Sequence, residues 1–214
     1  MFNFAFQSTL NMEKTKYIED IKEIKDIMAR TTKLISLSGL SGVSTGLIAL
    51  SGVYIAFITV FKDQQYLIHN AVELTHANQF HLLIIALGTL ILSIGCAIFF
   101  TNRKIKVKNH NIWNVQTKRL LIHLLIPLTT GGLLCLMFLF KGFIGILPSI
   151  TLIFYGLALV SGSKYTLSEI RNLGIIQIIL GLLAFQFINL SLLFWALGFG
   201  IVQIIYGLII QRKY

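Results

Sequence analysis

The chain has 214 residues, of which 56% are hydrophobic and only 12% are charged. In an ordinary soluble domain roughly a quarter of the residues are charged, so the composition excludes a protein of that class. In a soluble protein, the net charge of +10 would suggest that it binds nucleic acid. Here the basic residues flank apolar blocks, so we expect no nucleic-acid partner and interpret the charge as a signal of membrane topology.

The first 33 residues are expected to lie outside the membrane. Residues 1–11 carry no charge and lack the basic start of a signal peptide, whereas Met12 is followed by Glu and Lys. One hypothesis is therefore that residues 1–11 are an upstream extension. Residues 13–30 place apolar side chains on one helical face and hold five acidic and five basic residues. They predict an amphipathic helix that packs either on the protein itself or on a partner.

Long apolar blocks follow, and each is long enough to cross a bilayer as a helix. Continuous apolarity without period-two alternation excludes a transmembrane barrel. We therefore predict an all-α integral membrane protein in which residues 34–210 form one domain of six spans and residues 211–214 form a tail. The predicted spans are 34–61, 82–100, 120–140, 142–159, 173–188 and 192–210.

Basic residues indicate the orientation of these spans. The N-terminal segment, the second-to-third and fourth-to-fifth connections and the tail together hold sixteen of the eighteen Lys and Arg residues. These four segments share one side in a six-span protein. Because cytoplasmic loops carry the excess of Lys and Arg, we expect both termini to be cytoplasmic.

The short connections at Lys141-Gly142 and 189–191 predict antiparallel hairpins, so we expect three hairpins in all. The last hairpin contains a sequence echo, GIIQIILGLL at 174–183 and GIVQIIYGLI at 200–209, which we interpret as a weak repeat. Gln177 and Gln203 lie 13 residues either side of Leu190, at similar depth. They are candidates for a hydrogen-bonded clasp across the hairpin or, alternatively, for a pair that contacts a substrate.

Small residues at helical spacing predict close helix approach. The expected packing positions are Gly42 and Gly46 in the first span, Gly174 and Gly181 in the fifth, and Gly200 and Gly207 in the sixth. The stripe in the first span serves either internal packing or contact with a second copy or another membrane protein. Pro127 and Pro148 are expected to kink the third and fourth spans.

The spans contain no Asp, Glu, Lys or Arg in their interiors, which leaves histidine as the candidate for chemistry. His123 is a binding candidate near the cytoplasmic end of the third span. His69, Glu73 and His76 have spacings of four and three and would share one face of a helix. That face either holds Zn²⁺ or is a solvated interfacial surface. We expect no cofactor.

The segment LISLSGLSGVSTGLIALSGVYIAF at 34–57 resembles small polytopic, six-span inner-membrane proteins of bacteria to which no activity is assigned. The resemblance covers mainly the first span and implies the membrane class without functional residues. Our leading expectation is a non-enzymatic accessory, scaffold or sensor subunit in the cytoplasmic (inner) membrane of a bacterium, in contact with the lipid bilayer. The alternative is a small transporter or channel for an uncharged or weakly polar solute.

Overall fold

The computed structural model describes residues 21, 39–61, 76–108, 115–166 and 168–213. Residues 36–214 form one compact unit, and residues 1–35 form a separate one of which only Ile21 is described. Apart from Ile21, the predicted amphipathic helix at 13–30 therefore lies outside the described residues, as do His69 and Glu73.

Every regular element in the described residues is helical, and the longer ones follow the apolar blocks of the sequence. They are α2 (Gly39–Ala56), η1 (Phe57–Phe61), α3 (His76–Lys108), α4 (Val115–Phe140), η2 (Ile144–Ile146), α5 (Leu147–Gly162), η3 (Ser163–Tyr165), α6 (Ser168–Gln186), η4 (Ile188–Leu190), α7 (Ser191–Trp195), η5 (Ala196–Val202) and α8 (Gln203–Lys213). Of the short elements, η1 and η5 are π-helices, and η2, η3 and η4 are 3₁₀-helices.

Six helical segments in the described residues are long and apolar enough to cross a membrane. They are Gly39–Val60, Phe80–Phe100, Lys118–Phe140, Ile144–Tyr165, Glu169–Gln186 and Ile188–Lys213. The expected all-α class and the number of apolar segments are thus confirmed. In lipid, a helix satisfies every backbone polar group within its own segment, which is why uninterrupted apolarity is sufficient to predict these elements.

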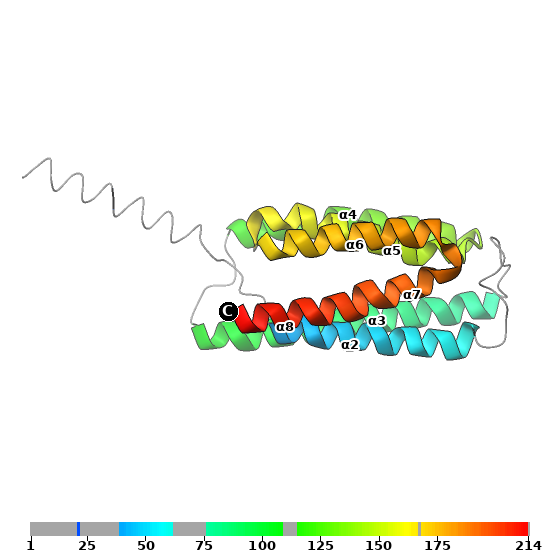
Figure 1. Cartoon of the computed structure of the whole chain (residues 1–214), viewed down its shortest axis with the longest axis horizontal. Helices are drawn as coiled ribbons and strands as arrows, with labels where there is room; N and C mark the ends of the chain where they lie inside the picture. The colour runs from blue at the N-terminus through cyan, green and yellow to red at the C-terminus, as the bar shows by residue number, and fades with distance from the viewer. Residues whose placement is uncertain (1–20, 22–38, 62–75, 109–114, 167, 214) are drawn as a thin grey trace, which may run out of the picture. The chain divides into compact units, whose positions relative to one another are not determined.

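The helices of residues 39–213 form two groups (Figure 1). In one group α5 packs against both α4 and α6, and in the other α2 packs against both α3 and α8. The chain passes from the first group to the second through η4, α7 and η5. The last two spans therefore do not form a tightly packed hairpin, because α8 leaves α6 and packs on α2 instead.

Of the two prolines expected to kink their spans, Pro127 lies inside its helix, whereas Pro148 lies at the start of one. Helix α4 continues through Pro127, and Pro148 lies in the first turn of α5. A proline is tolerated in that turn because the backbone N–H that it lacks would have no partner within the helix. The turn before α5 instead depends on Gly142, whose φ of 80° favours glycine.

Candidate functional site

Glycines bring the helices of each group into backbone contact. A Cβ built on Gly156 would lie 2.6 Å from the carbonyl oxygen of Gly174, and one on Gly207 would lie 2.6 Å from the carbonyl oxygen of Gly39. The α5–α6 pair and the α2–α8 pair are thus closed by the same device: glycine against backbone. Such close approach increases van der Waals contact, which drives helix association where lipid already solvates apolar side chains.

All six glycines that the sequence singles out lie at these contacts. A Cβ on Gly174 or Gly181 would meet α5, and one on Gly42, Gly46, Gly200 or Gly207 would meet the opposite helix of the α2–α8 pair or its extension η5. The small-residue stripe of the first span is therefore covered from within the chain. This arrangement favours internal packing over dimerisation through the same face.

Gln177 and Gln203 do not form the expected clasp with each other. Gln177 is fully buried on α6, and its Nε2 donates a hydrogen bond of 2.8 Å to the carbonyl oxygen of Gly198 in η5. Gln203 Nε2 donates to the hydroxyl of Tyr155 on α5 at 3.2 Å. Because α8 packs on α2, equal depth in the membrane does not bring the two amides together. Each glutamine instead links its own helix pair to the other pair.

A row of side chains continues this contact between the two pairs. The ring of Phe199 lies 4.9 Å from that of Tyr155 and 4.8 Å from that of Trp195, measured between centroids. Trp195 Nε1 in turn donates a hydrogen bond of 3.0 Å to Thr151 Oγ1. The indole N–H of Trp195, a polar group on a large apolar ring, thus has its partner inside the protein.

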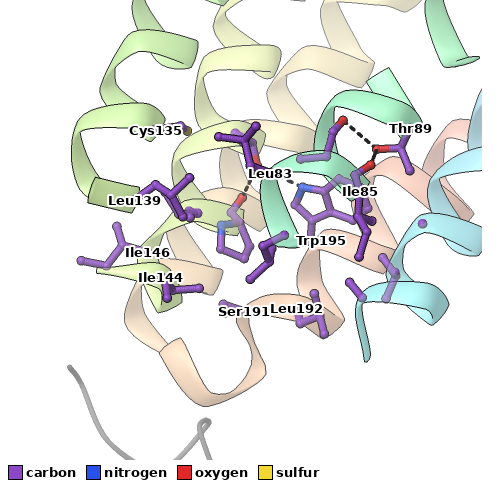
Figure 2. A pocket seen from close by; sticks show the side chains of 18 of the residues that line it. Leu83, Ile85, Thr89, Cys135, Leu139, Ile144, Ile146, Ser191, Leu192 and Trp195 are labelled. Atoms are coloured by element: carbon purple, nitrogen blue, oxygen red, sulfur yellow. Dashed lines mark hydrogen bonds between the residues drawn. The ribbon is translucent and has the colours of Figure 1, made fainter. Parts of the chain in front are cut away.

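The row ends at a cavity of about 420 Å³, which we call the lateral cavity. Residues of α2, α3, α4, η2, α5, η4 and α7 line it. Figure 2 shows Leu83 and Thr89 of α3, Cys135 and Leu139 of α4 and Trp195 of α7 around this space. The volume falls within the range of small-molecule sites, about 300–1,000 Å³.

The lining is almost entirely apolar. Its described residues include no carboxylate, ammonium, guanidinium or imidazole group. The hydroxyls of Thr151 and Thr89 already donate to backbone carbonyls of their own helices, at 2.9 Å each. The cavity therefore suits an uncharged, mainly hydrocarbon molecule, since a charged one would lose its hydration without gaining a partner.

The histidine candidates lie elsewhere. His123 Nε2 is 3.2 Å from the hydroxyl of Tyr165, and the two rings stack with centroids 5.2 Å apart. His123 is exposed and Tyr165 is half-buried, and the pair joins α4 to η3 outside the lateral cavity. The described residues contain no group of three potential metal ligands, and the predicted set of His69, Glu73 and His76 is mostly outside them.

The six apolar helices, with large hydrophobic side chains exposed along them, define a multi-pass membrane protein. No family model, curated protein or solved structure matches the sequence.

Sequence reasoning missed the lateral cavity, with Thr151 and Gly132 in its lining. The sequence gives only a weak indication that Gly132 lines a cavity. A Cβ built there meets nothing within 4 Å, whereas one on the adjacent Gly131 would lie 2.4 Å from Phe154. Consecutive glycines in the sequence do not reveal which of the two faces a neighbouring helix and which faces a cavity.

Proposed function

We propose that the protein lies in a bacterial cytoplasmic membrane with both termini in the cytoplasm. The proposal rests on the sixteen-to-two distribution of Lys and Arg between the two sides. A fluorescent protein fused after Tyr214 should fluoresce in cells, and alkaline phosphatase inserted after Gly142 should be active. An active phosphatase fused after Tyr214 would contradict this orientation.

Within that membrane, we propose a non-enzymatic role in which the protein binds an uncharged, largely apolar molecule, as a sensor or accessory protein would. The observation that supports it is the lateral cavity, an uncharged space of about 420 Å³ between α2–α3 and α4–α5. An apolar cavity of this kind binds hydrocarbon in preference to water.

A second candidate is transport of the same kind of molecule. Its support is the division of the spans into two groups linked by Gln177 and Gln203, together with π-helix η5 at the crossing. Transport sites in membrane proteins commonly lie between packed groups of helices, and π-helical turns are frequent at functional sites. Movement of the bound molecule into protein-containing liposomes, but not into empty ones, would separate transport from binding alone.

Native mass spectrometry of gently extracted protein tests binding directly. Gly132→Phe adds a large side chain to the lining of the cavity, at a position where a Cβ has no neighbouring atom within 4 Å. Gly95→Phe is the matched control, because a Cβ on Gly95 also has no neighbour within 4 Å and Gly95 does not line the cavity. A bound small-molecule mass should appear with the unmodified protein and Gly95→Phe, and disappear with Gly132→Phe. No bound mass, or one that survives Gly132→Phe, would overturn the proposal.

A further inference from the structure

The lateral cavity has exposed residues on two of its sides. On α3 these are Ala86, Leu87 and Leu90, and on α4 they are Gly132 and Leu136. The opposite part of the lining is buried, as at Ala56 and Ser191. Helices α3 and α4 do not pack extensively on each other, since α3 packs on α2 and η1 whereas α4 packs on α5, η2 and η3. The cavity therefore opens sideways, between α3 and α4.

The depth of this opening can be obtained from each helix independently. Leu87 lies seven residues from the start of the apolar segment Phe80–Phe100, which is about 10 Å along the helix. Gly132 lies eight residues before the end of the segment Lys118–Phe140, which is about 12 Å. Both distances place the opening within the hydrocarbon layer, whose thickness is about 30 Å.

What lies outside this opening follows from the exposure of α3. None of the residues in the apolar window of Phe80–Phe100 is buried. Leu87 and Leu90, at the rim, are 50% and 54% exposed. Side chains of this kind at this depth contact lipid hydrocarbon, so the space in front of the cavity is filled by acyl chains.

We propose that one acyl chain of a bilayer lipid enters the lateral cavity between α3 and α4 and lies against Trp195. This rests on the proposed function and specifies its ligand as lipid. The match is chemical as well as geometric. The lining offers apolar contact without a charged group, and a lipid acyl chain needs no aqueous route to enter the cavity. A water-soluble solute would have to cross hydrocarbon to reach the same opening.

The two tryptophans of the chain provide a local probe. Trp113→Phe leaves Trp195, which lines the cavity, as the only tryptophan. Bromine atoms on an acyl chain quench a tryptophan that they contact. The experiment measures the tryptophan fluorescence of this variant in nanodiscs of dioleoyl phosphatidylglycerol and in nanodiscs of the same lipid brominated at its double bonds. The same comparison is then made after Gly132→Phe or Gly95→Phe is added to the Trp113→Phe protein.

Quenching should be strong in the Trp113→Phe protein, unchanged by Gly95→Phe and at least halved by Gly132→Phe. Ala86→Phe, which enters the cavity from α3, should act like Gly132→Phe and serves if that variant does not fold. Equal quenching in all variants, or none in the first, would overturn the lipid proposal. If native mass spectrometry still shows a cavity-dependent ligand, the binding function stands and the ligand is another apolar molecule.

Discussion

Replacing Gly156 by alanine should separate the α5–α6 pair. The added Cβ would lie 2.6 Å from the carbonyl oxygen of Gly174 and 2.9 Å from the backbone nitrogen of Ile178. Both atoms belong to the backbone of α6, so no side-chain rotation relieves the clash and the helices must move apart. Overpacking of this kind costs about 1–3 kcal/mol of unfolding free energy.

The matched control is Gly95→Ala, because a Cβ on Gly95 meets nothing within 4 Å. Alanine is favoured over glycine inside a helix by about 1 kcal/mol, and this gain applies to both variants. The net loss expected for Gly156→Ala is therefore about 0–2 kcal/mol relative to the unmodified protein. The difference between the two variants isolates the overpacking cost, about 1–3 kcal/mol.

Reversible unfolding in mixed micelles of increasing SDS content, followed by circular dichroism, measures these free energies. Gly156→Ala should unfold at lower SDS than Gly95→Ala, with the same loss of helicity. If the two variants have free energies within about 0.5 kcal/mol of each other, the close contact between α5 and α6 does not exist as described.

Three further predictions concern polar side chains. Gln203→Leu and Tyr155→Phe remove the same hydrogen bond, so a double-mutant cycle in the SDS assay should give a coupling of about 0.6–1.7 kcal/mol; strictly additive losses would contradict the bond. Glu169→Gln removes the ion pair between α6 and the end of α8. Because the pair is partly exposed, the loss of unfolding free energy should be at most about 1 kcal/mol and smaller at high salt. A loss that does not change with salt would show that the charge is not its cause. The zinc hypothesis predicts stoichiometric metal by elemental analysis, lost in the double variant His69→Ala/His76→Ala, and absence of zinc from the unmodified protein ends it.

Much of the fold was predictable because it depends on local properties of the chain. A helix in lipid satisfies its own backbone, so the apolar blocks alone predict the six segments. The glycine stripes also predict which helix faces approach a neighbour, since the spacing that places Gly174 and Gly181 on one face is a property of the helix itself. Neither prediction requires knowledge of the partner helix.

The candidate site was less predictable because its residues come from distant parts of the chain. Gln177 and Gln203 were found from their spacing and depth, but their partners, Gly198 and Tyr155, were not. All six segments are apolar enough to cross a membrane, and hydropathy does not determine which of them pair. The short connection at 189–191 likewise does not reveal that α8 packs on α2 and not along α6.

By itself, the sequence determined that this chain crosses a membrane as six helices with small-residue faces, because length, apolarity and helical periodicity act within each segment. Only the tertiary structure decided that α8 packs on α2, that the two glutamines link separate helix pairs and that a cavity lies between α3 and α4. The physical reason is that these features depend on the fit between surfaces that the chain brings together from segments far apart, and close packing selects among pairings that apolarity leaves equal.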